Sequence, residues 1–396
     1  MNAKSAKPLR GEPQPAGGRT RKAKAVAGNG DPARGAKGEL GNGSARLEAA
    51  PAEPRAKRAN RRQLKAAQDS RADRAHGALA GLALGDALGM PTQSMPRDQI
   101  AKEFGRVAEL RDAPDNQPIA PGLKAGTVTD DTAQALIVAD LLVKGRGRID
   151  PAELAAALAA WEADMIRRGS HDLLGTSTKA ALAALRAGVP VEESGKGGTT
   201  NGAAMRIAPV GIVQIPTSAL WDRVREATAV THGANLGLAA AYGVAAAVSV
   251  GVDGADSADA VIAGIAAAHF GAQRGFWVAG ADIAARFDAL APAARELGAA
   301  PFERFLYEVV GTSVHSQESI VAAFLLVDRF ADDPRAALTA AASLGGDTDT
   351  IAAVAGAILG ATHGAGAFPA AELAQVEEVN GLDLRETASR LLALRD

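Results

Sequence analysis

One short segment places two carboxylates and two hydroxyls where an apolar helix pattern begins. It is residues 344–350, LGGDTDT, which follows a helix pattern opening at Pro334 and starts another that runs to Leu359. A single Asp before a helix usually caps its free amides. Two Asp and two Thr in four residues exceed what a cap requires, and crowded carboxylates are stable only when a cation neutralises them. The segment therefore favours a metal site over simple capping.

A second segment repeats this arrangement. Residues 129–132, TDDT, follow a loop containing Gly122 and Gly126 and precede another helix pattern. The chain has no cysteine, and its histidines show no paired metal spacing, so oxygen ligands indicate Mg²⁺ or Mn²⁺ rather than zinc or copper. Alone, this segment fits a helix cap equally well. Two such clusters meeting across a helical core would hold a binuclear site.

Glycine-rich polar turns form a third, weaker group: residues 81–89, 169–171 and 197–206. Glycines let backbone N–H groups approach a phosphate, and Arg206 could pair with one. The four-residue spacing of the glycines in 81–89 fits a helix–helix contact equally well. A lone Arg is more often a surface residue. These turns alone do not decide between the alternatives.

The elements that must position these residues are helices. Asp150 and Pro151 open one helix with an N-cap acceptor and an N1 proline, and Asp333 with Pro334 repeats the device. β-Branched runs are short and alternation is rarely sustained. Residues 75–396 are therefore predicted to form one all-α body. Its longest stretch without charge, residues 227–252, is mostly Ala and Gly, which favours a buried central helix over a membrane span.

The first 74 residues differ from this body in charge and composition. They hold 18 Lys and Arg against 7 Asp and Glu and no aromatic residue, while the remainder holds 25 against 38. Such a segment cannot bury enough apolar surface to offset chain entropy, so we expect a disordered basic tail with a transient helix near residues 56–74. An inert extension is favoured over a nucleic-acid contact. With 47% hydrophobic residues, a net charge of −2 and no secretory signal, we expect a soluble, cytoplasmic protein without membrane contact.

Five segments taken in order carry a family resemblance: GLALGDALGMP, TVTDDTAQAL, TTNGAAMRIAPVG, THGANLG and LGGDTDTIAAVAGAILGATHG. Together they resemble the signature blocks of the ADP-ribosylglycohydrolase family, which includes dinitrogenase reductase-activating glycohydrolase. They extend from about His76 to Gly364. The resemblance implies a compact multi-helix bundle of that family's type, with a cleft that holds two Mg²⁺ or Mn²⁺ ions and ADP-ribose.

The resemblance also assigns roles to individual residues. It implies that the metal ligands are Thr129, Asp130, Asp131, Asp347, Asp349 and Thr350, with Asp349 as the bridge. It makes Asp131 and Asp349 catalytic. Candidate substrate contacts are Asn201, Gly202, Ala203, Arg206, His232 and Ser170. For His232 a buried, hydrogen-bonded histidine is an equal alternative, and His363 is interpreted as structural.

One residue departs from the family pattern. Gln93 stands where the block ending in Met90-Pro91-Thr92 usually continues with a glutamate. A glutamate could share in proton transfer, whereas an amide can only form hydrogen bonds. We nevertheless retain Gln93 among the candidate catalytic residues.

The function expected is metal-dependent hydrolysis that removes ADP-ribose from a modified acceptor. Protein ADP-ribosyl-arginine is the favoured substrate, and other ADP-ribose conjugates are alternatives. The competing hypothesis is a weakened or inactive binder of ADP-ribose or a nucleotide-sugar, because Gln93 replaces the usual acid.

Overall fold

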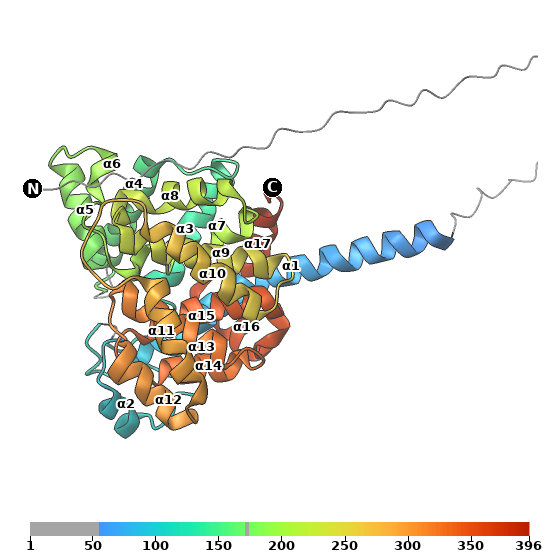
Figure 1. Cartoon of the computed structure of the whole chain (residues 1–396). Helices are drawn as coiled ribbons and strands as arrows, with labels where there is room; N and C mark the ends of the chain where they lie inside the picture. Colours follow the sequence, from blue (N-terminus) through green and yellow to red (C-terminus); the bar gives the residue numbers. More distant parts are fainter. Residues whose placement is uncertain (1–54, 120, 171–173, 396) are drawn as a thin grey trace, which may run out of the picture. The chain divides into compact units, whose positions relative to one another are not determined.

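A computed structural model describes residues 55–119, 121–170 and 174–395 (Figure 1). Within these ranges the regular elements are all helical and no strand is present, which confirms the all-α prediction. The predicted tail up to residue 54 lies outside the described residues.

Helices of very different lengths follow one another in the chain. The α-helices are α1 (Arg55–Gly89), α2 (Arg97–Glu103), α3 (Asp130–Lys144), α4 (Pro151–Arg167), α5 (Thr176–Arg186), α6 (Val191–Ser194), α7 (Ala208–Val213), α8 (Ser218–His232), α9 (Asn235–Val252), α10 (Ser257–Ala272), α11 (Ile283–Glu296), α12 (Ala299–Phe305), α13 (Ser316–Arg329), α14 (Pro334–Ala342), α15 (Thr348–His363), α16 (Ala370–Asn380) and α17 (Leu384–Leu392). Single turns of other helix types are η1 (Met90–Thr92), η2 (Asn201–Ala203), η3 (Leu306–Val310, π-helical) and η4 (Ala365–Ala367).

The predicted caps are present at α4 and α14. The Asp150 side chain accepts from the N–H of Ala152, and the Asp333 side chain accepts from the N–H of Ala336. Both helices also carry proline in their first turn. These contacts confirm the start positions read from the sequence.

The helices α1 and α15 pack backbone to backbone at the centre of this body. Their contact follows the four-residue glycine spacing of α1: a Cβ on Gly81 would lie 2.1 Å from the carbonyl oxygen of Gly356, and one on Gly85 would lie 2.2 Å from that of Ala352. Any larger side chain would force the helices apart. The spacing in residues 81–89 is therefore a helix–helix contact.

The uncharged stretch 227–252 is divided between two helices. Its first residues finish α8, and its longer part is α9. This helix has a mean hydropathy of 1.6, and 89% of its residues are buried. By length and composition α9 is the one helix in the described ranges that could cross a membrane. Its burial among neighbouring helices matches the predicted central helix.

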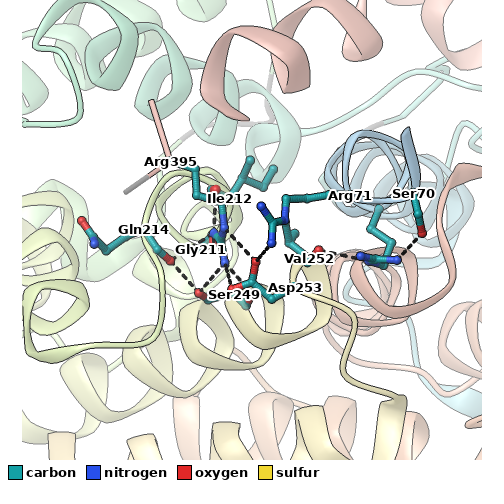
Figure 2. A network of polar contacts seen from close by, with 10 residues as sticks. Ser70, Arg71, Gly211, Ile212, Gln214, Ser249, Val252, Asp253 and Arg395 are labelled. Atoms are coloured by element: carbon teal, nitrogen blue, oxygen red, sulfur yellow. Dashed lines mark hydrogen bonds and ion pairs between the residues drawn. The ribbon is translucent and has the colours of Figure 1, made fainter. Parts of the chain in front are cut away.

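The predicted boundary after residue 74 falls inside α1. Arg71 forms an ion pair with Asp253 at 3.2 Å, and the Nε of Arg74 donates to the carbonyl oxygen of Val252 at 3.0 Å. These bonds join α1 to the end of α9 (Figure 2). The last residues of the predicted tail thus contribute contacts to the helical body.

Arg395, near the C-terminus, contacts the same end of α9. Its guanidinium donates to the carbonyl oxygens of Gly211 at 2.8 Å and Ile212 at 2.7 Å, at the end of α7. It also donates to the carbonyl oxygen of Ser249 at 2.8 Å and to Asp253 at 2.8 Å (Figure 2). A side chain that is 4% exposed therefore ties α7, α9 and the C-terminus together.

Candidate active site

The N-termini of α3 and α15 meet at a cavity of about 200 Å³. The two clusters that the sequence singles out are far apart in the chain, since Asp131 and Thr350 are 219 positions apart. Packing brings them to one place, as a binuclear arrangement would require. The lining consists of Gln93, Ser94, Ile119, Asp130, Asp131, Gly175, Thr176, Thr178, Thr200, Asn201, Gly202, Met205, Val314, Asp347, Asp349 and Thr350.

A double-glycine turn brings the chain into α15. Gly345 and Gly346 have φ values of +88° and +83°, a region that side chains with a Cβ rarely adopt. A Cβ on Gly346 would also lie 2.3 Å from the carbonyl oxygen of Thr312. Asp347 follows at the N-cap position, yet in the described chain its side chain makes no cap hydrogen bond. Capping therefore does not account for this carboxylate.

Asp86 of α1 caps α3 from a distance. Its fully buried carboxylate accepts from the backbone N–H groups of Thr129 and Thr132, each at 3.0 Å, and from both hydroxyls at 2.8 and 2.5 Å. Asp130 and Asp131 are thus released from capping. Asp86 is not among the candidate residues of the sequence, because a single acid within a glycine-rich helix carries no local signal of this role.

Two carboxylate oxygens of this acidic cluster remain without a hydrogen-bond partner among the described residues. Among the described residues, Oδ1 of Asp131 and Oδ1 of Asp349 are buried and accept no hydrogen bond. The other oxygen of Asp131 accepts from the hydroxyl of Thr350 at 3.3 Å. A buried, unpaired carboxylate oxygen is unfavourable unless a proton or a cation satisfies it.

The electrostatics of the cluster reflect this crowding. Burial raises the pKa of Asp131 and Asp349 well above the usual value, and the negative charges of neighbouring carboxylates raise it further. Burial raises the pKa of Asp347 to about 6, although hydrogen bonds from Asn201 and Thr350 act in the opposite direction. The cluster therefore binds protons more strongly than separate carboxyls would.

Hydrogen bonds hold the two remaining carboxylates from outside. Asp130 accepts from the Nε2 of Gln134 at 2.7 Å. Asp347 accepts from the Nδ2 of Asn201 at 2.5 Å, and the same amide nitrogen donates to Ser319 at 2.8 Å. Asn201 thus acts on a carboxylate as well as lining the cavity.

Of the other predicted substrate contacts among the described residues, only some line the cavity. Gly202 lines the cavity, and a Cβ there would lie 3.1 Å from the His232 ring. Ala203 and His232 are fully buried, and His232 is hydrogen-bonded at both ring nitrogens. Ser170 follows the end of α4 and is not among the described residues that line the cavity.

Arg206 is neither a surface residue nor part of the cavity lining within the described ranges. It is fully buried and donates to Gln134 at 2.8 Å and to Thr231 at 2.6 Å. Burial lowers the pKa of Arg206 to about 10, so it stays charged at neutral pH. Arg206 therefore contacts Gln134 and Thr231, which in turn bond to Asp130 and His232.

Gln93 lines the cavity and is almost fully buried. The residue is 6% exposed, and among the described residues its Nε2 has no hydrogen-bond partner. Its backbone carbonyl oxygen accepts from the Nε2 of Gln117 at 2.9 Å, which fixes the main chain there. Gln93 therefore offers a hydrogen-bond donor where the family pattern leads us to expect an acid.

The donor chemistry of the cluster fits a hard divalent cation. It consists of carboxylate and hydroxyl oxygens, two of them buried and unsatisfied. However, the described residues include no group of three His, Cys, Asp or Glu positioned to hold a metal as they stand. The cluster thus has the oxygen chemistry that suits a divalent cation, but its described carboxylates do not form a ready metal-binding group.

The four aspartates at the N-termini of α3 and α15 line one cavity of an all-α body. This arrangement is typical of a helical enzyme whose active site is built from carboxylates. The chain belongs to the ADP-ribosylglycohydrolase family, whose model matches residues 67–396. Family membership supports an ADP-ribosyl hydrolase activity.

Individual relatives agree with this assignment. The uncharacterized protein YegU of Escherichia coli is 36% identical, with 82% of this chain and 97% of YegU covered. The ADP-ribosylarginine hydrolase Tri1 of Pseudomonas putida is 29% identical, with 75% and 72% covered. A solved structure titled ADP-ribosylglycohydrolase-related protein complex aligns with a TM-score of 0.57 and 27% identity, covering 82% of this chain and 98% of that one.

Proposed function

We propose that this protein is a divalent-metal-dependent hydrolase that releases ADP-ribose from a modified acceptor, preferably an arginine side chain of a protein. The observation that carries the proposal is the pair of buried, unsatisfied oxygens, Oδ1 of Asp131 and Oδ1 of Asp349, in one cavity. The similarity to Tri1, an ADP-ribosylarginine hydrolase, supports the arginine preference.

Six oxygen-bearing residues would hold two Mg²⁺ or Mn²⁺ ions: Thr129, Asp130, Asp131, Asp347, Asp349 and Thr350. Such ions would supply Lewis acidity and positive charge for the ribose hydroxyls and the attacking water. Their charge would also offset the repulsion that raises the carboxyl pKa values.

The carboxylates have a direct part in the bond exchange. Water oxygen bonds to C1″ of the ribose while the bond from C1″ to the acceptor nitrogen breaks, and its electron pair leaves with the guanidine. Asp349 accepts the water proton, this proton is passed on to the departing nitrogen, and Asp131 orients the attacking water. Carboxylate charge stabilises the positive ribose in the transition state.

Neighbouring residues position the substrate and the acids. Asn201 holds Asp347 by its amide, and Gly202 leaves room for a sugar above the buried His232 ring. The Nε2 of Gln93 donates a hydrogen bond to substrate or water. It cannot transfer a proton, so proton transfer falls to the aspartates.

The test is turnover of an ADP-ribosylarginine peptide with defined metal. We expect hydrolysis that chelation stops and that Mg²⁺ or Mn²⁺ restores, and loss of turnover in Asp131→Asn and Asp349→Asn. The matched control is Asp140→Asn, which removes an exposed carboxylate of α3 that pairs with Arg390. Calorimetric binding of ADP-ribose without turnover of any conjugate would identify a binder instead, and metal-independent cleavage would refute the proposed chemistry.

A further inference from the structure

Behind the cavity, six polar side chains form one continuous hydrogen-bonded chain. Its two end residues, Asp130 and Thr200, both line the cavity, and its middle is buried. The bonds, in order along the chain, join Asp130 to Gln134 at 2.7 Å, Gln134 to Arg206 at 2.8 Å, Arg206 to Thr231 at 2.6 Å, Thr231 to His232 at 2.8 Å and His232 to Thr200 at 2.9 Å.

Arg206 fixes the direction of this chain because it is at its centre. A guanidinium has N–H donors and no acceptor. Gln134 and Thr231 must therefore both accept from Arg206. Every other donor in the chain then has to point away from Arg206, toward the cavity.

On the side of Asp130, the bond from Arg206 determines how the Gln134 amide is oriented. Gln134 presents its Oε1 to Arg206, so its Nε2 is left to face Asp130. Asp130 accepts this bond. The orientation of the Gln134 amide is thereby set by Arg206.

On the side of Thr200, the bond from Arg206 influences the tautomer of the His232 ring. The Thr231 hydroxyl accepts from Arg206, and its own proton has two acceptors within reach: Nδ1 of His232 at 2.8 Å and the carbonyl oxygen of Thr228 at 3.4 Å. The 2.8 Å contact would form with either tautomer, but a hydroxyl that accepts from a guanidinium is polarised into a stronger donor and a poorer second acceptor, so donation to Nδ1 is favoured. Nδ1 of His232 then carries a lone pair, and a neutral ring has its proton on Nε2.

Electrostatics support the same assignment. Burial lowers the pKa of His232 well below its usual value, and the positive charge of Arg206 lowers it further. The ring is therefore neutral. A proton on Nδ1 would direct the positive end of an N–H bond toward the side of the ring that faces Arg206.

We infer that Arg206 is a positioning residue that holds His232 as the Nε2–H tautomer and so leaves the hydroxyl proton of Thr200 directed into the cavity. Thr200 accepts from Nε2 of His232 and can donate to an oxygen of the bound substrate, a ribose hydroxyl or the diphosphate. Only this last step depends on the proposed function. The tautomer does not.

The first experiment reads the tautomer in the unmodified protein. Ring ¹⁵N spectra of histidine-labelled protein at neutral pH should show His232 as Nε2–H, with its signal assigned by its absence in His232→Gln. An Nδ1–H ring or a charged ring would overturn the inference. The measurement requires neither metal nor substrate.

Two substitutions then test the role of Arg206. Arg206→Lys keeps a charged donor and should preserve the tautomer. Arg206→Met frees Thr231 to donate to Thr228, so a population of the Nδ1–H form should appear. An unchanged tautomer in a folded Arg206→Met variant would show that Arg206 does not set it. If that variant fails to fold, the spectrum of the unmodified protein still decides the tautomer.

The last experiment tests the donor at the cavity. Calorimetry with ADP-ribose and Mg²⁺ should show about three- to tenfold weaker binding for Thr200→Val, the effect of one lost hydrogen bond, and near-normal binding for Thr200→Ser. Equal affinity in Thr200→Val would overturn the donor role. If the unmodified protein binds no ADP-ribose, the proposed function fails while the tautomer result remains decisive.

Discussion

Asp349→Asn should change stability in opposite directions without and with metal. The substitution keeps the shape of the side chain and removes one charge from a buried cluster, where Asp349 is 2% exposed. Without a cation, that charge is repelled by the neighbouring carboxylates, so the variant should be more stable than the unmodified protein. With Mg²⁺ or Mn²⁺, the variant lacks a ligand and should be the less stable of the two.

The size of the effect follows from the carboxyl pKa values. The pKa of Asp347 rises from 3.8 to about 6, and two pKa units correspond to about 3 kcal/mol. A raised pKa means that the folded state binds protons more tightly than the unfolded chain. Stability is therefore lost as pH rises from about 4 through about 6, and the full cost is present at pH 7. Asp349 is buried in the same cluster, and its pKa is raised by burial and then by the charges of Asp347, Asp86 and Asp130. Removing its charge should therefore recover a cost of similar order, about 1–3 kcal/mol, or about 2–5 °C in Tm.

The assay is thermal unfolding of metal-free protein between pH 5 and pH 8, repeated with Mg²⁺. The unmodified protein should lose Tm with rising pH and regain about 2.7 kcal/mol at a hundredfold excess of metal over Kd. Asp349→Asn should show a flatter pH profile and little gain from metal. Asp140→Asn, an exposed substitution on α3, should follow the unmodified protein. A lower metal-free Tm, or an unchanged gain from metal, in Asp349→Asn would refute the reasoning.

Three further predictions concern the rest of the molecule. Gln93→Glu restores a nearly isosteric acid in the cavity, so if proton transfer limits the reaction, kcat should rise by up to about 10²–10⁴, with a much smaller change in ADP-ribose affinity; an unchanged or lower kcat would mean that the aspartates suffice. Arg395→Ala removes a buried hub of hydrogen bonds and should lower stability by about 2–4 kcal/mol in denaturant unfolding, whereas the exposed Arg390→Ala should cost less than about 1 kcal/mol. A chain starting at Ser70 should keep the full Tm, but one starting at Ala75 should melt lower because it loses two arginine contacts with the end of α9.

The sequence predicts the helical architecture and the two acidic segments well, because both depend on local signals. Caps such as Asp150 and apolar periodicity determine where helices begin within a few residues. The segments 129–132 and 344–350 exceed the requirements of a cap, and packing brings their carboxylates into one cavity. Segments dense in polar oxygen thus lie at one cavity, and their role as metal ligands stays a prediction.

Residues that act across the fold leave no comparable local signal. Asp86 looks like one acid in an apolar glycine-rich helix, and only its packing against the start of α3 makes it the cap of that helix. Arg206 is a single basic residue after a turn, and its burial behind the cavity depends on contacts with α3 and α8. Side-chain partners of this kind are set by tertiary packing, which one sequence does not display.

The close pairing of α1 and α15 explains how both acidic segments keep their positions. A Cβ on Gly89 would lie 2.5 Å from the Cα of Asp349, so the backbone of α1 directly limits where α15 begins. Three residues earlier, Asp86 holds the start of α3 through backbone N–H groups. The last turn of one helix thus fixes the N-termini of two others. The relative position of Asp131 and Asp349 is therefore set by helix backbones rather than by loops.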